Sequence, residues 1–367
     1  ANTTGSENTA VGLSALAANT TAVSNSAFGF KTLFVNTTGA KNTALGESAL
    51  RANTTASNNT AVGFSALTAN TTGTRNVAMG ALALVTNTTS NDNVAIGGGT
   101  SGVSFAALQS NTTGNHNTAV GSGALGANTT GVENVAIGSA AGLDNTTGNN
   151  NTFVGRDAGR ANTTAGNNTF IGERAGLANT TGDESVAVGQ FAYSANTTGV
   201  DNVAIGRSAL AANTTANFNV AIGRAALLSN TTASQNTAVG SSCLDANTTG
   251  DNLTAIGFDA LGANTTATNN TACGSKAGNQ ITTGGNNTCV GFDALTRCTT
   301  GGNNACLGFE AGDNITTGSS NVCVGIEAGT NITQGDNNVC VGNATETSGE
   351  AAANCITIGH NISAAGS

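Results

Sequence analysis

The sequence repeats itself every 17 residues from Asn2 almost to its end. Residues 2–18 read NTTGSENTAVGLSALAA, and the next unit begins again with NTT. With the asparagine of that triplet as position 0, the frame holds for 21 units, with a seven-residue insertion within 98–107 and degenerate last units over 332–367. A short fixed period is typical of repeat architectures, in which each unit is one structural rung. We therefore expect a single repeat domain over residues 1–367.

The unit favours strands over helices. Its recurrent phrase is NTAVG or NVAIG, which is β-branched and bounded by asparagine and glycine. No unit holds the roughly ten residues of unbroken helical pattern that a helix requires. The prediction is an all-β fold, a parallel β-solenoid (β-roll) of about 21 coils with a 17-residue repeat. Positions 6–9 are predicted to form one strand, glycine at position 10 a corner, and positions 13 to 2 a second strand. Stacked about 4.8 Å apart, the coils would extend for about 100 Å.

Equivalent positions should form ladders along the stack. Position 10 is glycine and position 9 is apolar in every unit, and position 6 is asparagine in 18 units. We expect positions 7 and 9 to point inward and position 8 to point outward, where an uncharged column would contact another chain. Asparagines at positions 0 and 6 could link their side-chain amides from coil to coil. Representative ladder residues are Gly12, Gly29, Gly46, Gly63 and Gly80, Val11, Val62 and Ile96, and Asn8, Asn25 and Asn42.

Charge is sorted by position within the unit. Of 31 charged residues, 29 occupy positions 4, 5, 11, 12, 15 and 16, which should be solvated corners, because burying an unpaired charge is costly. The net charge of −9 argues against nucleic acid as a partner. No stretch approaches the roughly 20 apolar residues of a membrane span.

Two columns exchange bulk in neighbouring units. Phe153 and Phe170 occupy position 8, where alanine is usual, and both units carry glycine at position 14, where leucine is usual. This pattern, with Gly159 and Gly176, predicts that positions 8 and 14 share space.

All eight cysteines lie from Cys243 onward, and four of them form a predicted ladder at position 8 of successive units. Adjacent members would lie about 4.8 Å apart, so disulfides between coils are geometrically conceivable. We favour the alternative, a column of small, partly buried residues that replace alanine. A single line of thiols does not suit the tetrahedral geometry of zinc. The ladder residues are Cys289, Cys306, Cys323 and Cys340.

The NTT triplet supports two further hypotheses. Each triplet matches the acceptor pattern for N-glycosylation, which makes Asn2, Asn19, Asn36, Asn53 and Asn70 candidate sites, although full occupancy at this spacing would be crowded. Alternatively, regular threonine ladders on a flat solenoid resemble the ice-binding faces of antifreeze proteins.

Several NVAIG phrases carry a family resemblance. Residues 93–97, 134–138 and 202–206 resemble the head repeats of YadA-type trimeric autotransporter adhesins, and also repeat arrays of tail-fibre-like proteins. The unit here is longer than the usual head repeat. The resemblance implies a left-handed parallel β-roll, usually a homotrimer, displayed outside the cell and without catalytic residues.

These features together predict a structural protein. The two histidines, His116 and His360, are far apart in sequence, and the chain shows no HExxH, CxxC or P-loop spacing, so we expect no enzyme activity, no bound metal and no cofactor. We expect an extracellular or cell-surface fibre subunit whose partners are further copies of itself and, with an adhesive role, surface glycans. The first coil, which has full repeat character from Asn2, suggests head-to-tail stacking, and a lateral trimer is the alternative.

Overall fold

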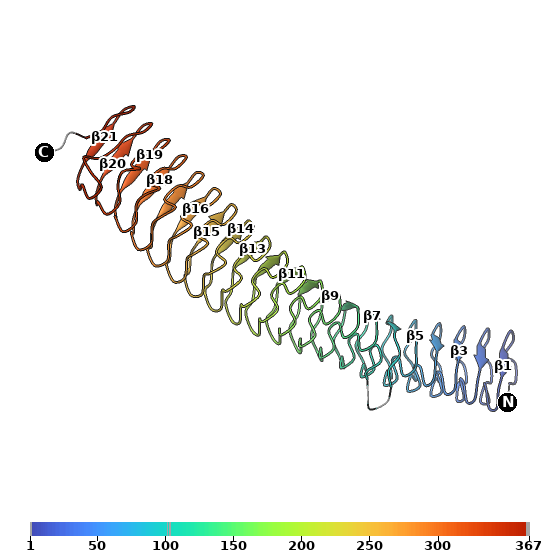
Figure 1. Ribbon diagram of the computed structural model, residues 1–367. Coiled ribbons are helices and arrows are strands. Elements are labelled where there is room, and N and C mark those ends of the chain that lie inside the picture. The colour runs from blue at the N-terminus through green and yellow to red at the C-terminus, as the bar shows by residue number, and fades with distance from the viewer. Residues whose placement is uncertain (1, 101, 103, 365–367) are drawn as a thin grey trace. The chain divides into compact units, whose positions relative to one another are not determined.

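The computed structural model describes residues 2–100, 102 and 104–364 and confirms the predicted fold class (Figure 1). In these residues the chain is an all-β solenoid of 21 parallel strands with no helix, and each rung of about 17 residues contributes one strand of three residues. The chain divides into two compact units, residues 1–185 and 186–367, and each is described separately below. The prediction of a single domain stays a prediction.

The first unit holds ten strands, which pair in parallel and in register from one rung to the next. They are β1 (Thr9–Val11), β2 (Ser26–Phe28), β3 (Thr43–Leu45), β4 (Thr60–Val62), β5 (Val77–Met79), β6 (Val94–Ile96), β7 (Thr118–Val120), β8 (Val135–Ile137), β9 (Thr152–Val154) and β10 (Thr169–Ile171).

The second unit holds eleven strands with the same pairing. They are β11 (Val186–Val188), β12 (Val203–Ile205), β13 (Val220–Ile222), β14 (Thr237–Val239), β15 (Thr254–Ile256), β16 (Thr271–Cys273), β17 (Thr288–Val290), β18 (Ala305–Leu307), β19 (Val322–Val324), β20 (Val339–Val341) and β21 (Ile356–Ile358).

The glycine at position 10 ends each strand and turns the chain. Gly240 has φ +144°, and a Cβ built on it would lie 2.2 Å from the backbone oxygen of Gly257 on the next rung. The same overlap recurs along the column, for example between Gly12 and Gly29. The predicted glycine ladder is therefore confirmed, and it exists because a side chain at this corner would occupy the space of the neighbouring backbone.

The predicted orientation of the strands is wrong. Position 8 points into the coil, where Ala136, Phe153 and Cys289 are fully buried, whereas position 9 points outward. The physical reason is the narrowness of the coil, which admits mostly alanine on the strand because leucine at position 14 fills the opposite wall. The β-branched residues at positions 7 and 9 therefore lie on the outer face.

The predicted second strand is also absent from the described residues. Positions 13 to 2 form turns, because residues at positions 12 and 14, such as Asp157 and Leu125, adopt positive φ angles of 58° and 49°. Backbone hydrogen bonds between rungs nevertheless continue here, as from Leu125 N to Ala141 O (2.9 Å). Turns and strand thus share one ladder, which satisfies the backbone of both.

Two columns of asparagine side chains link their amides from rung to rung, as predicted. Both columns are buried, whereas the predicted strand orientation would have placed position 6 outside together with position 8. At position 6, Asn134 Nδ2 donates to Asn117 Oδ1 (3.1 Å) and to the backbone oxygen of Gly148 (2.8 Å). At position 0, Asn53 Nδ2 donates to Asn36 Oδ1 (2.8 Å). These amides therefore bond to the neighbouring rungs, so the polar groups that they bring into the core have hydrogen-bond partners.

The exchange of bulk between positions 8 and 14 is confirmed. A Cβ at Gly159 would lie 2.4 Å from the ring of Phe153, and a Cβ at Gly176 would lie 2.4 Å from the ring of Phe170. The same exchange places Cys306 against Gly312 and Cys323 against Gly329. The two positions share one fixed volume, so a larger residue at one requires a smaller residue at the other.

The irregular segments interrupt the ladder without ending it. In the insertion, Thr100 and Ser104 form an antiparallel bridge, and Ala107 N donates to Gly97 O (3.0 Å) where the regular rung resumes. The degenerate last rungs still pair β20 with β21.

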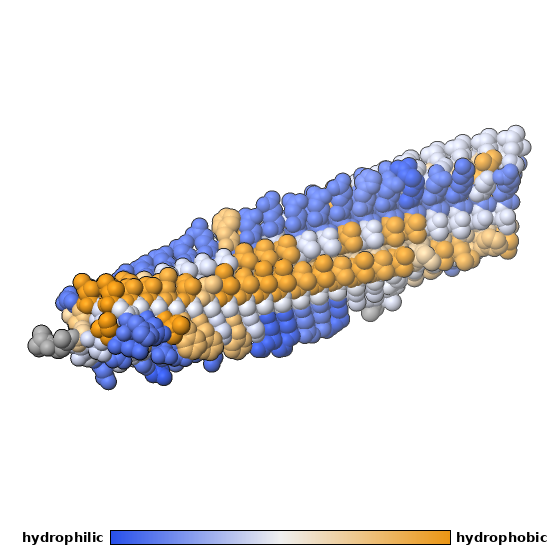
Figure 2. Space-filling view, turned by 90° about the horizontal axis from the view of Figure 1, so that it is seen from above, coloured by the Kyte–Doolittle hydropathy of each residue, from blue (hydrophilic) through white to orange (hydrophobic). Residues whose placement is uncertain are grey.

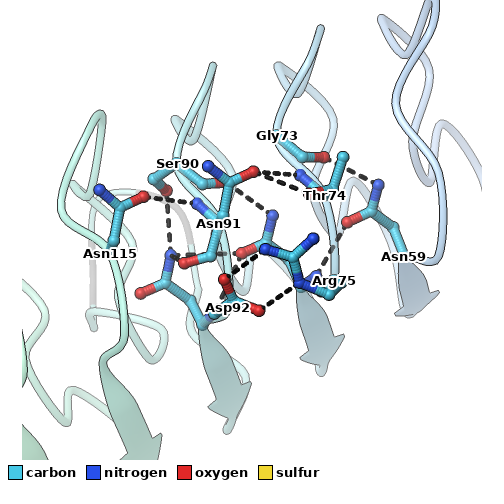
Figure 3. A network of polar contacts seen from close by, with 10 residues as sticks. Asn59, Gly73, Thr74, Arg75, Ser90, Asn91, Asp92 and Asn115 are labelled. Atoms are coloured by element: carbon cyan, nitrogen blue, oxygen red, sulfur yellow. Dashed lines mark hydrogen bonds and ion pairs between the residues drawn. The ribbon is translucent and has the colours of Figure 1, made fainter.

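A polar network joins the corners at positions 4 and 5 (Figure 3). Asn91 Oδ1 accepts from the backbone nitrogen of Thr74 (2.7 Å), and Asn115 Oδ1 accepts from that of Asn91 (2.7 Å). Beside them, Arg75 forms a two-pronged ion pair with Asp92 and lowers the pKa of that carboxyl. The side chains of Arg75 and Asp92 are 58% and 26% exposed, so this charged corner is solvated, as predicted, and is also linked from rung to rung.

Candidate functional site

The outer face of the strands presents one continuous apolar feature in each unit. Position 9 is apolar in every rung, and its side chains are exposed or half-exposed, with exposed fractions of 37% at Ile222, 55% at Val11 and 66% at Ile358. We call this set the apolar column. In Figure 2 it is the orange line that follows the strands of each unit. Scattered apolar side chains are normal on protein surfaces, but a contiguous apolar strip marks an interaction surface.

The column is built by strand alternation. Position 8 enters the narrow interior, so positions 7 and 9 must point outward on the same face. Position 7 is mostly threonine or valine and is mostly half-buried, and no charged residue occurs at either position. Each rung therefore adds two uncharged side chains to a regular surface at the strand spacing of about 4.8 Å.

A second row of side chains runs beside the column at position 11. In the rungs of β12 to β19 we call it the flanking row, and Figure 2 shows orange, white and blue residues following one another beside the orange line. Within it the rings of Phe292 and Phe309 stack at 5.5 Å and 11°. The row consists of Arg207, Arg224, Ser241, Phe258, Ser275, Phe292, Phe309 and Ile326.

Carboxylates lie next to the aromatic part of this row, at position 12. Loss of solvation, together with Asp313, Glu327 and Asp293, raises the pKa of Glu310. The surface is therefore locally negative around β17 to β19, whereas Arg207 and Arg224 bring positive charge beside β12 and β13.

The candidate glycosylation sites lie mostly in the interior. Asn19, Asn36, Asn53 and Asn70 are fully or almost fully buried, and Asn2 is exposed. Asn36 Nδ2, for example, donates to the backbone oxygen of Gly39 (2.9 Å). A glycan on such a nitrogen would displace that bond and could not fit inside the coil, so the folded rungs argue against modification at the four buried sites.

The Asn-Thr-Thr segment does not form the flat array that the ice-binding hypothesis requires. The asparagine is buried, and the first threonine is half-buried with its hydroxyl donating to the next rung, as Thr129 Oγ1 does to Thr146 O (3.0 Å). Only the second threonine, such as Thr147, is exposed. One exposed threonine per rung is a single line and not a two-dimensional surface.

The predicted cysteine ladder stacks in register. Cys289, Cys306, Cys323 and Cys340 are fully buried free thiols on adjacent strands. This arrangement bears out the column of small residues and shows no disulfide among them. Outside this ladder, Cys273 occupies position 9 and is exposed within the apolar column.

Buried thiols predict a loss of stability in alkali. Burial raises the pKa of Cys243 to about 12 and that of Cys298 to about 11. Below the thiol pKa of the unfolded chain, about 8.5, both states are neutral. Above it the unfolded chain ionises first, so stability falls progressively towards the folded pKa.

Replacing Cys243 by alanine, the usual residue at position 13, should remove one such contribution. Between pH 8 and pH 10 we expect the variant to lose about 2 kcal/mol less stability than the wild-type chain. Thermal midpoints at the two pH values measure this difference, and an equal drop in both proteins would contradict the expectation.

The other chemically reactive groups are not assembled into a site. His116 lies at a position 5 corner of the first unit and His360 in the last rung of the second. The described residues hold no group of three or more His, Cys, Asp or Glu side chains arranged to bind a metal ion. In the same part of the chain, no helix has the length and apolarity needed to cross a membrane.

Sequence reasoning missed the direction of the apolar column and therefore its exposure to solvent. The signal was present in the exchange between positions 8 and 14, because two positions that share space must both face the interior. Strand alternation then places position 9 outside. The flanking row was also missed. Its mixture of phenylalanine, serine and arginine indicates a surface feature only once position 11 is known to lie beside an exposed apolar column.

No family model matches the chain, and no curated protein matches it.

Proposed function

We propose that the chain is a structural subunit of an extracellular or cell-surface fibre, which assembles by burying its apolar column against further copies. The observation that carries this proposal is an uncharged apolar strip, one side chain wide, that is exposed or half-exposed on every rung. The apolar column is a line of exposed and half-exposed side chains, whereas enzymes use concave pockets. An adhesive role would be added at the charged corners.

The energetics favour assembly over many rungs. Fully burying a valine or isoleucine stabilises by about 1.5–3 kcal/mol, so a side chain left about 40% exposed retains about 0.6–1.2 kcal/mol. Ten rungs offer about 6–12 kcal/mol, which is comparable to the cost of association of about 4–15 kcal/mol. The gain grows with each rung that is buried, whereas the cost of association is paid once, so association should become stable only when many rungs take part. A long repeat protein meets this condition. The parallel trimer implied by the family resemblance could use the same column.

Charges placed in the column should abolish assembly without unfolding the rungs. We expect the double variant Ile205→Lys and Ile222→Lys to sediment as a 35.5 kDa monomer at concentrations where the wild-type chain forms larger species. Lysines on the outer face remain solvated in the monomer but would be buried unpaired in the assembly.

The matched control places lysines on the same two rungs away from the column. Thr198 and Thr215 are exposed at position 2, so Thr198→Lys with Thr215→Lys should leave assembly intact. A wild-type chain that remains a monomer at all accessible concentrations would refute self-assembly. Labelling of the chain on intact producing cells tests the location.

A further inference from the structure

We propose that two copies pair antiparallel through residues 186–367, about a two-fold axis that runs along the strands between β15 and β16. This inference rests on the proposed self-assembly and specifies its geometry. An axis of this kind makes an isologous contact, in which position 9 meets position 9 and position 11 meets position 11. Rung order is reversed, so β15 faces β16, β14 faces β17, β13 faces β18 and β12 faces β19.

The flanking row is complementary to itself about this axis. Phe258 faces Ser275 of the second copy, and Phe292 faces Ser241, so each of these rings meets a small residue. Because both rings are about half exposed, each has apolar surface to bury in the space above a serine. Because the rung order is reversed in the second copy, a phenylalanine lies opposite a serine on each of the four central rungs, β14 to β17.

The outer rungs of the same row are complementary in charge. Arg224 faces Phe309 and lies opposite the neighbouring Glu310, and Arg207 likewise lies opposite Glu327. A guanidinium in this place can make a cation–π contact with the aromatic ring and an ion pair with the carboxylate, and both interactions are favourable. Loss of solvation and the neighbouring carboxylates of Asp313, Glu327 and Asp293 raise the pKa of Glu310, so a guanidinium from the second copy would meet a locally negative surface.

Position 7 follows the same symmetry. Thr254 faces Thr271 at the centre, Thr237 faces Thr288 next to them, and Val203 faces Val322 at the outer rungs. Polar side chains therefore meet polar ones at the centre, and apolar side chains meet apolar ones outside. In the apolar column itself every opposed pair is uncharged.

Neighbouring registers lose this match. An axis on β15 would place Phe258 against Phe258 and Asp259 against Asp259, and an axis on β16 would oppose Asp259 to Asp293. The axis between the two strands instead opposes Asp259 to Lys276. Like charges directly opposite each other are destabilising, so electrostatics favours this register over those with an axis on β15 or on β16.

Paired cysteine substitutions test the geometry directly. In a Cys273→Ser, Cys355→Ser background, one chain carries Ile222→Cys on β13 and another carries Leu307→Cys on β18. The inferred register sets these positions opposite each other across sheets about 10 Å apart, within reach of a short bismaleimide. Two copies of the first variant would have their thiols about 24 Å apart, since five rungs separate the facing positions. We expect cross-links in the mixture and none in either variant alone.

The other outcomes separate this inference from the proposed function. Cross-links within each variant alone would indicate parallel copies, and oligomers without any cross-link would indicate another face or register. Either result overturns the antiparallel pair but leaves self-assembly standing. A single 35.5 kDa species without cross-links would defeat both proposals.

A charge exchange gives an independent readout in the wild-type background. Arg224→Glu alone and Glu310→Arg alone should each weaken dimerisation at least about tenfold, because each opposes like charges across the axis. The double variant restores opposite charges and should return to within about threefold of the wild-type affinity. Additive losses in the double variant would overturn the pairing of β13 with β18.

Discussion

Replacing Gly240 by alanine is expected to cost on the order of 3–5 kcal/mol and to disrupt the rungs around β14. The residue has φ +144°, which strains any residue with a Cβ, and the new methyl group would lie 2.2 Å from the backbone oxygen of Gly257. The neighbouring backbone cannot move away, because it belongs to the same ladder of hydrogen bonds. Amide hydrogen exchange should show lost protection in β13 to β15.

The matched control is Gly349→Ala. A Cβ on Gly349 would have no neighbour within 4 Å, so this variant should have near wild-type stability. Equal stability of the two variants would show that the position 10 corners do not stack as described.

Changing Asn134 to aspartate should destabilise the first unit by roughly 3–5 kcal/mol at neutral pH. The amide nitrogen of Asn134 donates to Asn117 Oδ1 and Gly148 O, and an aspartate would point a buried carboxylate at both oxygens. Protonation relieves this repulsion. Burial and repulsion raise the folded pKa of the new carboxyl, so the penalty is absent below the unfolded pKa of about 3.9 and grows as pH rises above it.

Thermal melts of Asn134→Asp between pH 4 and pH 7 measure this penalty, with Asn150→Asp as the control. Asn150 is exposed at a corner of the adjacent rung, so its change to aspartate adds the same charge without burying it. A comparable loss in both variants, or no recovery of Asn134→Asp in acid, would contradict a continuous buried amide column.

The repeat was sufficient to predict the fold class, the strand at the NVAIG phrase and both asparagine ladders. The period fixes which residues stack, and asparagine is one of the few side chains that both donates and accepts along such a stack. The glycine corner followed for the same reason, because one residue type at every equivalent position indicates a backbone constraint.

The orientation of the strand could not be read from hydrophobicity. Position 9 is more apolar than position 8, and apolar residues are usually buried, yet here alanine faces inward and isoleucine outward. The coil is too narrow for a large residue on the strand unless position 14 becomes glycine, as beside Phe153. The segment from position 13 to 2 likewise looked like a strand, whereas left-handed residues such as Leu125 make it a series of turns.

The surface proposed for assembly was the least predictable part. Its flanking row has no period of its own, and the proposed complementarity of Phe258 with Ser275 is defined only in relation to a second copy. A surface that is satisfied by a partner leaves weak signals in a single chain, because folding alone places few demands on it.

The labelling rate of Cys273 by maleimide tests the central claim most directly, since this thiol stands in the apolar column. In a Cys355→Ser background we predict fast labelling in dilute solution, where the column is exposed, and labelling at least about tenfold slower at concentrations that give oligomers. Ile205→Lys with Ile222→Lys should restore the fast rate. Slow labelling in dilute solution would place the column inside the coil, and a rate independent of concentration would show that copies do not meet there.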